Sequence, residues 1–440
     1  MAERKPKILL LSTFDIDGGA TAWLLNFAKV LINNDYQVAM AVKQKTSNYS
    51  FVYKIPAPPR PKSRIKCFWL KYITQRQRDI SRDQVGEYGF FYKGLETSSV
   101  YRAEDIVSTI PFVPDVIIMS LTNDFVNTCT LRNLQHIWGE TMRVMLIGYD
   151  MNAFTGGCHI LMGCEGFANK CMSCPAFESK SRQKEVEESY VLKMKNVREG
   201  NMGVLYTSAY SAMICSKSLF ATQPQYDLGM CIDTHFFTNE NRDIAKRIFN
   251  LPLKSKVVFA GSEDLNATRK GAKYFFEALK VLWDNLSEKE KENTYILLVG
   301  KNKETLKPYL STLPPYHFQY IDFITDYRLL SLAYQAADIF VCPTIDDAGP
   351  MMVAEALSCG TPVVGFKMGL MYDQTYVQDG ITGYVVELKN VEQLANAILK
   401  ILRLNVKEYD SMSKRCRQLA IDKLSVEHTI DLMSHFTCKK

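Results

Sequence analysis

No apolar run in this chain of 440 residues approaches the roughly 20 residues that a membrane-spanning helix needs. The apolar run near the N-terminus is short and is followed by two aspartates, so it predicts a first β-strand and disfavours a secretory signal peptide. No repeat of solenoid length is visible, and no nucleic-acid-binding module can be recognised. These absences indicate an ordinary globular protein, and we expect no nucleic acid among its partners.

Twelve cysteines are present, but nothing in the sequence directs the chain to an oxidising compartment. This combination indicates a reducing compartment and argues against a disulfide framework. Apolar residues make up 47% of the chain and charged residues 23%, which is typical of soluble globular proteins. The length favours two or three domains, because a single core rarely grows so large. We therefore expect a cytoplasmic protein of more than one domain.

The net charge of +6 is concentrated in one segment, residues 60–83. This segment carries eight basic and two acidic residues, with aromatic and aliphatic side chains among the charges. Two structures are compatible with it: an amphipathic helix that binds an anionic membrane surface, or a solvated helix with one face packed on its own domain. The first alternative predicts a peripheral protein on the inner face of the cell membrane.

The N-terminal part begins as strand, glycine turn, helix and strand. The run Lys7–Ser12 predicts a buried strand, the apolar spacing over 20–32 predicts a helix, and Gln37–Val42 predicts the next strand. This order opens a doubly wound α/β domain. Gly18 and Gly19 would let a phosphate or a sugar approach the backbone, or would form an ordinary tight turn. No G-x-G-x-x-G follows the first strand, which argues against a dinucleotide-binding oxidoreductase.

Strands and helices continue to alternate, in two series joined near residues 235–250. Short apolar runs predict further strands at Asp115–Ser120, Arg143–Gly148, Tyr210–Ser216, Lys256–Gly261, Tyr295–Gly300, Phe318–Phe323 and Ile339–Pro343. Two series of this kind predict an α/β protein with two Rossmann-like domains.

The segment Val341–Leu388 reads as strand, loop, short helix, strand and loop. We expect the helix from Pro350 to Ser358, because proline suits a first turn and a glycine and a proline follow the helix end. A helix N-terminus after a parallel strand offers amides and partial positive charge to a phosphate. Asp347 and Glu355 would flank this phosphate, which predicts a nucleotide-sugar site. The plainer alternative is a capping acid and a helix-surface acid.

Six motifs in the chain resemble the GT-B glycosyltransferases of family 4, the retaining glycosyl transferases group 1. They are a GGA-like loop at Asp17–Ala20, an NGID-like junction at Cys231–Phe236, an RKG at Arg269–Gly271, an E-x7-E-like pair at Asp347–Glu355, an EA-x-x-CG-TPVV-like segment at Ala354–Val364, and a dG-x-x-G turn at Asp379–Gly383. In addition, TGGCH at Thr155–His159 and the cysteines after it resemble a polysaccharide-biosynthesis subgroup. The resemblance covers nearly the whole chain.

This resemblance implies two facing Rossmann-like domains with a cleft between them. The acceptor domain would occupy 1–237 and contain the basic segment and a cysteine-rich insertion at 155–178. The nucleotide-sugar donor domain would occupy 238–424. A helix at 425–440 would pack back on the first domain.

The resemblance also implies roles for individual donor-site residues. Arg269 and Lys270 would neutralise the donor diphosphate, which is the leaving group, and stabilise the charge that develops on it. Asp347 would hold hydroxyl groups of the donor sugar, and Glu355 those of the ribose. Glycines and backbone amides would complete the donor site, at Gly18, Gly19, Gly261, Gly349, Met351 and Met352. Without the other motifs, an Arg-Lys pair would indicate only solvated surface.

Several positions depart from the family pattern. Asp347 replaces a Glu and shortens its reach by one methylene group, and Ser262 stands where many members have Arg. The loop Met368–Asp373 replaces a Gly-Gly-x-Pro-Glu sequence that contacts the donor sugar. Tyr149 and Asp150, which we place at the reaction centre and acceptor site, stand where the family has His-Asp. Tyrosine cannot act as an acid or base near neutral pH unless its pKa is strongly shifted. The leaving diphosphate can take the acceptor's proton, so we still expect an enzyme.

Four cysteines gather within 17 residues and end in a C-x2-C pair; they are Cys158, Cys164, Cys171 and Cys174. Four thiolates in a reducing compartment are typical of a closed, structural zinc site, although the spacing is not that of a standard zinc finger. The alternative is four free, buried thiols. Because four cysteine ligands leave no open position on the metal, a catalytic metal is not expected there. We expect no cofactor in catalysis.

The expected function is retaining, metal-independent transfer of a hexose from a UDP- or GDP-sugar to a saccharide or lipid-linked saccharide. The product would be a cell-surface polysaccharide. The alternative is a homologue that binds a sugar nucleotide or a glycan without transferring the sugar. Tyr149 and the loop Met368–Asp373 would favour this alternative.

Overall fold

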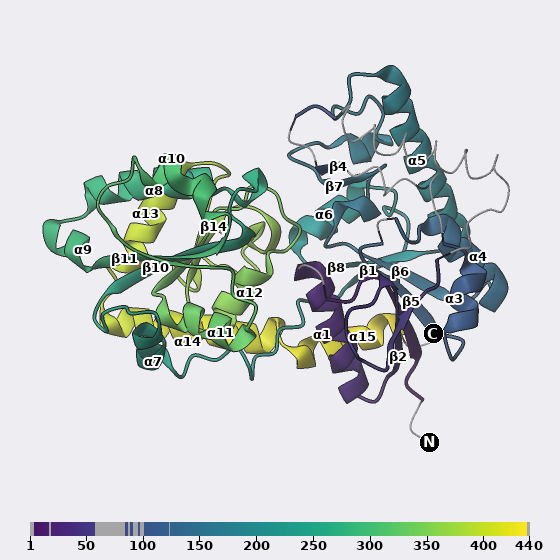
Figure 1. The fold of residues 1–440 in the computed structure, drawn as a ribbon, viewed down its shortest axis with the longest axis horizontal. Helices are drawn as coiled ribbons and strands as arrows, with labels where there is room; N and C mark the ends of the chain where they lie inside the picture. The colour runs from purple at the N-terminus through teal and green to yellow at the C-terminus, as the bar shows by residue number, and fades with distance from the viewer. Residues whose placement is uncertain are drawn as a thin grey trace. The chain divides into compact units, whose positions relative to one another are not determined.

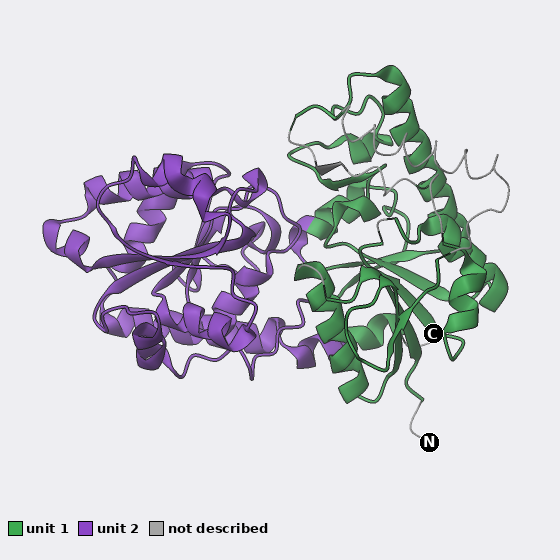
Figure 2. Cartoon of the chain, viewed as in Figure 1, with its two compact units in different colours: residues 1–207, 211–228, 432–440 green, residues 208–210, 229–431 purple. Residues whose placement is uncertain are grey.

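The computed structural model describes residues 4–16, 19–57, 84–86, 89–90, 96, 101–122 and 124–437 (Figure 1). The chain divides into two compact units, which we call unit 1 and unit 2 (Figure 2). Unit 1 comprises Met1–Thr207, Ser211–Leu228 and Leu432–Lys440, and unit 2 comprises Ser208–Tyr210 and Gly229–Asp431. The basic segment 60–83 lies outside the described residues.

Unit 1 is built on a seven-stranded parallel sheet with the strand order β3-β2-β1-β5-β6-β8-β9. The four residues Ile8 to Leu11 of the first strand are fully buried, because helices cover both faces of a doubly wound sheet. The strands are β1 (Lys7–Phe14), β2 (Gln37–Gln44), β3 (Val52–Lys54), β5 (Val116–Met119), β6 (Arg143–Ile147), β8 (Gly203–Tyr206) and β9 (Gln225–Asp227). A small antiparallel pair is formed by β4 (Gly89–Phe90) and β7 (Cys158–Ile160).

Among the described residues of this part of the chain, the helices are α1 (Gly19–Asn33), α3 (Ala103–Thr109), α4 (Thr128–Trp138), α5 (Lys180–Glu199) and α6 (Ala209–Lys217). Helix α1 lies on one side of the sheet and α3 and α4 lie on the other (Figure 1). The predicted strand Tyr210–Ser216 is wrong: it lies in α6, and the strand there is β8, a few residues earlier. A seven-residue apolar run fits a buried helix as well as a buried strand, so periodicity alone could not decide.

Unit 2 contains a six-stranded parallel sheet with the order β12-β11-β10-β13-β14-β15. The central strand β10 pairs with β11 on one side and with β13 on the other, where Val258 is opposite Ile339. The strands are β10 (Lys256–Asp264), β11 (Thr294–Lys301), β12 (His317–Ile321), β13 (Ile339–Cys342), β14 (Val363–Phe366) and β15 (Gly383–Val386). The two parallel sheets confirm the predicted α/β class with two Rossmann-like domains.

Helices cover both faces of the second sheet, with α8 and α13 on one face and α7, α11 and α14 on the other (Figure 1). The helices are α7 (Arg242–Ile248), α8 (Ala272–Asn285), α9 (Glu288–Asn293), α10 (Lys307–Leu310), α11 (Tyr327–Ala336), α12 (Met351–Ser358), α13 (Val391–Leu402) and α14 (Val406–Lys423). Short 3-10 turns include η5 (Thr268–Lys270) and η7 (Gly369–Met371). Helix α12 begins one residue after Pro350, close to its expected start.

The last helix, α15 (Val426–Thr437), ends among residues of unit 1. The Arg143 guanidinium donates to the Phe436 carbonyl oxygen at 2.7 Å, and the Phe436 ring lies 5.7 Å from the Tyr226 ring. These contacts join the end of the chain to strands β6 and β9. The cleft between two domains that the resemblance implies stays a prediction.

Arg417 on α14 ties the junction loop near 231–237 to the rest of unit 2. Its guanidinium donates to the carbonyl oxygens of Thr234 at 2.6 Å, Phe237 at 2.6 Å and Ser358 at 2.8 Å. In the same loop, the Ile232 amide donates to the carbonyl oxygen of Leu424, at the end of α14, at 2.8 Å. One side chain therefore satisfies three carbonyl groups that come from two distant segments.

We expect Arg417→Met to destabilise the protein by about 3 kcal/mol, because partly buried carbonyl oxygens lose charged donors. The measurement is the urea midpoint of unfolding. Arg415→Met is the control: this residue lies on the same helix, is exposed, and should cost less than about 0.5 kcal/mol. Equal midpoints for the two variants would contradict the role of Arg417.

Candidate functional site

The candidate site in unit 2 begins with the turn η5, which follows β10 and carries Arg269 and Lys270. Gly271 closes the turn with φ +72, a left-handed conformation that favours glycine. A Cβ atom at this position would lie 1.8 Å from the carbonyl oxygen of Pro343, at the end of β13. The Ile345 amide also donates to the Arg269 carbonyl oxygen at 2.8 Å. Close backbone packing therefore fixes the two cations beside the loop after β13.

Asp347 in that loop receives both cations. Its Oδ2 atom accepts from Lys270 Nζ at 2.6 Å and from Arg269 Nη1 at 2.9 Å. Burial by itself would raise the pKa of Asp347, but Lys270 and Arg269 outweigh it and lower that pKa to about 2. The site thus holds two positive charges and one negative charge at neutral pH. The three side chains are between 16% and 31% exposed, so a ligand in water can reach them.

Most of the other predicted donor residues surround the start of α12. Gly349 donates its amide to Asp347 Oδ1 at 3.2 Å. A Cβ atom on Gly261, in β10, would lie 3.4 Å from the Met352 side chain, so the two predicted residues are neighbours. Met351 and Met352 form the first turn of the helix. The structure therefore brings these residues together with Asp347.

Glu355 faces the interior instead. Its side chain accepts from the Tyr334 hydroxyl, on α11, at 2.6 Å, and the residue is 4% exposed. Burial raises the pKa of Glu355 to about 7, and the hydrogen bond from Tyr334 opposes part of this rise. Sequence reasoning missed Tyr334, because nothing in its spacing relative to Glu355 marks the two as partners.

The loop Met368–Asp373, where the family pattern breaks, packs onto the same site. Gly369 has φ +56, and a Cβ atom there would lie 2.7 Å from Pro350 Cδ and 2.9 Å from the Asp347 carbonyl oxygen. Leu370 and Met371 are buried in the core. This loop therefore contributes its backbone next to Asp347, while its apolar side chains anchor it.

In unit 1, the predicted residues Tyr149 and Asp150 follow β6. The Tyr149 hydroxyl hydrogen-bonds Ser120, at the end of β5, and donates to the Ala20 carbonyl oxygen at 3.3 Å. Burial raises the pKa of Tyr149 well above its ordinary value, so its hydroxyl stays protonated near neutral pH. Asp150 Oδ2 lies 2.7 Å from His159 Nδ1. Of the two predicted glycines, Gly19 begins α1 and Gly18 lies outside the described residues.

The four clustered cysteines all have free thiols. Burial and the neighbouring sulfurs raise the pKa of Cys158, and burial raises that of Cys171 to about 12, although the Gly156 amide donates to its sulfur at 3.3 Å. Within the described parts of the chain, no three His, Cys, Asp or Glu side chains stand where they could share a metal ion. The zinc site that we predicted at these four cysteines stays a prediction.

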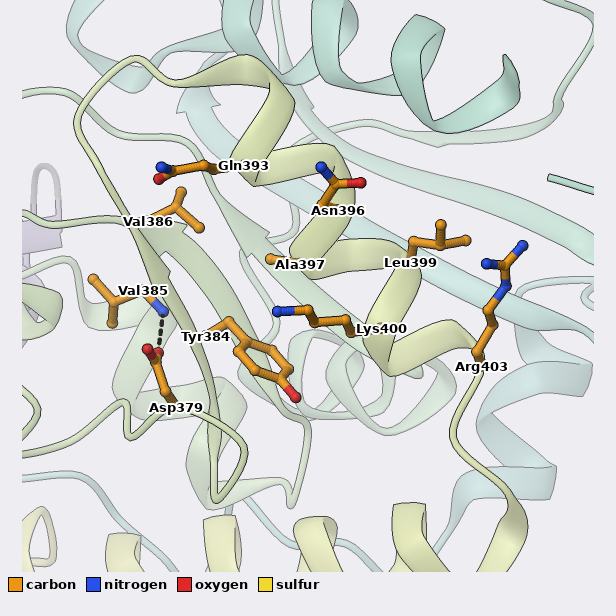
Figure 3. Close-up of a pocket in the computed structure, with 10 residues that line it drawn as sticks. All are labelled: Asp379, Tyr384, Val385, Val386, Gln393, Asn396, Ala397, Leu399, Lys400 and Arg403. Carbon is orange, nitrogen blue, oxygen red and sulfur yellow. Dashed lines mark hydrogen bonds between the residues drawn. The ribbon is translucent and has the colours of Figure 1, made fainter. Parts of the chain in front are cut away.

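One hollow of about 530 Å³ lies elsewhere in unit 2, between β15 and α13 (Figure 3). None of the predicted donor residues lines it. Its polar side chains serve the fold: Asp379 accepts from the Val385 amide at 2.8 Å, Lys400 covers the Tyr384 ring, and Arg403 pairs with Glu290. We therefore place the candidate site at Asp347 and not in this hollow.

The raised pKa of Glu355 predicts a pH dependence of stability. The folded state holds the Glu355 proton up to about pH 7, whereas the unfolded chain releases it near the ordinary value of 4.5. Unfolding therefore becomes more favourable as pH rises through this window. Glu355→Gln removes this effect. As pH rises from 4.5 to 7, the urea midpoint of the variant should therefore increase relative to that of the wild type. The exposed Glu387→Gln is the control, and a constant difference between Glu355→Gln and wild type across this range would contradict the prediction.

Residues 241–419 match the model of the family described as "Glycosyl transferases group 1". D-inositol 3-phosphate glycosyltransferase of Geodermatophilus obscurus is 36% identical over 93 residues, which cover 21% of this chain and 18% of that protein. The protein of the same name from Mycobacterium leprae (strain Br4923) is 31% identical over 104 residues, 24% of each chain. The matched segments thus span about a quarter or less of these relatives.

Solved structures are similar over nearly the full length. Sucrose-phosphate synthase of Thermosynechococcus elongatus has a TM-score of 0.63 at 15% identity and covers 98% of both chains. WaaG, a glycosyltransferase involved in lipopolysaccharide biosynthesis, has a TM-score of 0.62 at 13% identity, covering 98% of this chain and 100% of its own. HepE of Anabaena in complex with UDP-glucose has a TM-score of 0.62 at 14% identity, covering 98% and 99%.

At such identities the likeness concerns the fold alone, while the family match concerns the segment that carries Arg269, Lys270 and Asp347. Residues 241–419 are therefore a domain of the glycosyl transferases group 1 family, and the chain that contains them has the GT-B fold.

Proposed function

We propose that this protein is a retaining glycosyltransferase that moves a hexose from a nucleotide diphosphate sugar to a saccharide or a lipid-linked saccharide. The observation that carries the proposal is the pair of cations, Arg269 and Lys270, held by Asp347 at the carboxyl end of a parallel sheet. This end of an open parallel sheet is where ligands bind in doubly wound folds. The pair lies inside the segment that matches the family.

The two cations suit the diphosphate of the donor. In glycosyl transfer, negative charge builds up on the departing diphosphate, and fixed positive groups in a partly buried site stabilise it most effectively. Because Asp347 already holds both side chains in place, little side-chain entropy would be lost on binding. We propose that Arg269 and Lys270 supply this stabilisation without a metal ion. Asp347 would act mainly by positioning the two cations. We propose that it also contacts hydroxyl groups of the donor sugar.

The identity of the substrates is proposed from the similar structures. The similar Anabaena structure contains UDP-glucose, which supports a UDP-sugar donor, and WaaG acts in lipopolysaccharide biosynthesis, which supports a cell-surface glycan as product. We propose that Glu355 contacts the ribose of the donor. Because Glu355 is buried against Tyr334, this contact requires the side chain to turn outward or the ribose to reach the edge of the α12 turn.

A second candidate function is binding of a sugar nucleotide or a glycan without transfer. The phenol of Tyr149 favours it, because this group replaces a titratable histidine of the family pattern and stays protonated near neutral pH. Under this alternative, a nucleotide sugar would bind and no acceptor would receive its sugar. Transfer of the sugar to any acceptor would exclude it.

We expect Lys270→Ala to weaken binding of the donor sugar nucleotide roughly 10- to 100-fold, because a charged hydrogen bond to phosphate is lost. The measurement is calorimetric titration with UDP- and GDP-sugars. Lys273→Ala is the matched control, because Lys273 follows three residues later, is 61% exposed and pairs only loosely with Glu277 at 4.0 Å. Wild-type affinity in Lys270→Ala, with an unchanged fold by circular dichroism, would rule out this donor site.

We further propose that the protein binds an anionic membrane surface through the basic segment 60–83. No helix in the part of the chain that the structure describes is long and apolar enough to cross a membrane. Binding through basic side chains should weaken with salt, because ions screen charge over about 10 Å at 0.1 M. We expect co-sedimentation with anionic liposomes at low salt and its loss at high salt. Salt-independent binding, or none, would contradict this part of the proposal.

A further inference from the structure

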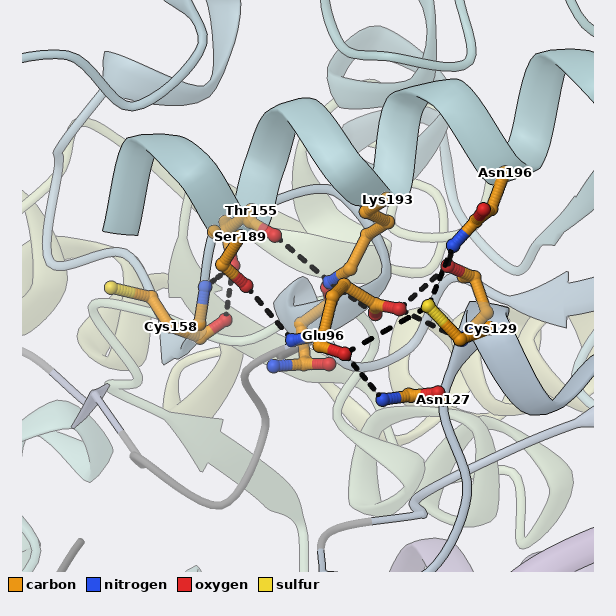
Figure 4. A network of polar contacts seen from close by, with 12 residues as sticks. Glu96, Asn127, Cys129, Thr155, Cys158, Ser189, Lys193 and Asn196 are labelled. Atoms are coloured by element: carbon orange, nitrogen blue, oxygen red, sulfur yellow. Dashed lines mark hydrogen bonds and ion pairs between the residues drawn. The ribbon is translucent and has the colours of Figure 1, made fainter. Parts of the chain in front are cut away.

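Unit 1 contains a buried ion pair between Lys193 and Glu96 (Figure 4). Lys193 projects from α5, and Glu96 lies opposite, with their side chains 1% and 2% exposed. Lys193 Nζ is 3.8 Å from Glu96 Oε1. Burial lowers the pKa of the lysine and raises that of the glutamate, and each charge opposes the shift of the other. Two charged groups withdrawn from water in this way are costly unless hydrogen bonds satisfy them.

The glutamate is satisfied at the start of α4. Glu96 Oε2 accepts from the Thr128 amide at 2.9 Å and from the Thr128 hydroxyl at 2.6 Å. Its backbone is held as well, because its amide donates to Ser189 Oγ at 3.0 Å and its carbonyl oxygen accepts from Asn127 at 2.8 Å. The carboxylate therefore has a fixed position near a helix N-terminus, where negative charge is favoured.

The lysine is satisfied by a loop. Lys193 Nζ donates to the Thr155 carbonyl oxygen at 2.9 Å and to the Asn152 carbonyl oxygen. An apolar side chain could fill the same volume, but it could not donate to these two carbonyl groups. The lysine therefore fixes the position of the loop between β6 and β7 through these two hydrogen bonds.

The loop and strand β7 together hold the Asp150 carboxylate at both oxygens. Oδ1 accepts from the Asn152 amide at 2.7 Å, and Oδ2 lies 2.7 Å from His159 Nδ1. Asn152 therefore accepts from Lys193 through its carbonyl oxygen and donates to Asp150 through its amide. The other carbonyl oxygen that accepts from Lys193 belongs to Thr155, whose side chain donates to the Cys158 carbonyl oxygen at 2.8 Å, next to His159.

Asp150 is the more accessible member of its pair. Its side chain is 17% exposed and that of His159 only 6%, so the histidine supports the carboxylate from inside. Tyr149 precedes Asp150 and binds Ser120, so both residues lie where the neighbouring strands β5 and β6 end. The carboxyl ends of parallel strands form the ligand-binding edge in folds of this class.

We propose that Lys193 is a positioning residue for the acceptor. Through the Asn152 and Thr155 carbonyl groups it holds the loop so that the Asp150 carboxylate, supported by His159, accepts a hydrogen bond from a hydroxyl group of a saccharide acceptor. The inference rests on the proposed function. It assigns an acceptor role to residues of unit 1 that take no part in the proposed binding of the donor diphosphate.

The first test reads the position of His159 without any substrate. Lys193→Met alone leaves Glu96 buried without its cation and can fail to fold, so the double variant Lys193→Met/Glu96→Gln removes both charges together. In protein labelled with 15N-histidine, with His159→Gln to assign the signal, the double variant should move the His159 ring resonance, and Asp150→Asn should move it as well. Lys195→Met is the matched control on the same helix, because Lys195 is 64% exposed. An unmoved His159 signal in the double variant overturns the inference.

The second test separates acceptor use from donor use, with UDP-glucose and GDP-mannose as donors and octyl glycosides as acceptors. In the double variant, transfer to the acceptor should fall roughly 10- to 100-fold through a higher KM for the acceptor, while donor binding stays at the wild-type level. Lys193→Arg, which keeps a donor, should recover part of the loss. Wild-type transfer by the double variant overturns the inference. Lys193 and Glu96 would then only neutralise each other's charge and would have no effect on the acceptor. A wild-type chain that binds no nucleotide sugar contradicts the proposed function and removes the acceptor role with it.

Discussion

The candidate donor site depends on one carboxylate, that of Asp347, which holds two cations against their mutual repulsion. Without it, Arg269 and Lys270 would extend into water, since like charges a few ångströms apart repel and long side chains gain entropy in solvent. The backbone provides the other half of this constraint. Gly271 lets the cation-bearing turn approach Pro343 so closely that any side chain there would collide with the strand end. The site is thus fixed by charge and by close packing of the backbone.

The two units solve a similar problem by opposite means. In unit 2, a partly exposed anion, Asp347, holds two cations. In unit 1, a buried cation, Lys193, holds the loop around a carboxylate, that of Asp150. In both, the holding group is less exposed than the group that it orders. In each unit, the candidate residues at the edge of the sheet therefore stay accessible while less exposed groups fix their geometry.

The sequence predicted the alternation of strands and helices well where apolar runs were bounded by clear turns. β1, α1 and β2 lie close to where they were expected, and α12 begins one residue after the expected proline. The error at Tyr210–Ser216 arose because a short apolar run without charged positions has no distinguishing period. Residue pairs were predicted only within motifs. Other contacts join residues that are separated in the chain and that only packing brings together, so no spacing in the sequence predicts them. They are Tyr334 with Glu355, His159 with Asp150, and Lys193 with Glu96.

The sequence by itself determined the α/β class, the segment that carries the candidate donor site, and the residue types at that site. These follow from local rules: apolar periodicity, glycine and proline at helix ends, and charged residues next to a strand end. Only the tertiary structure decided how Asp347 and Glu355 differ. Their spacing suggested that both flank a phosphate, but Asp347 precedes the helix and turns to the cations, while Glu355 lies on its buried face and meets Tyr334 from α11. Which side of a helix is buried depends on the neighbours that pack against it, and those neighbours come from distant parts of the chain.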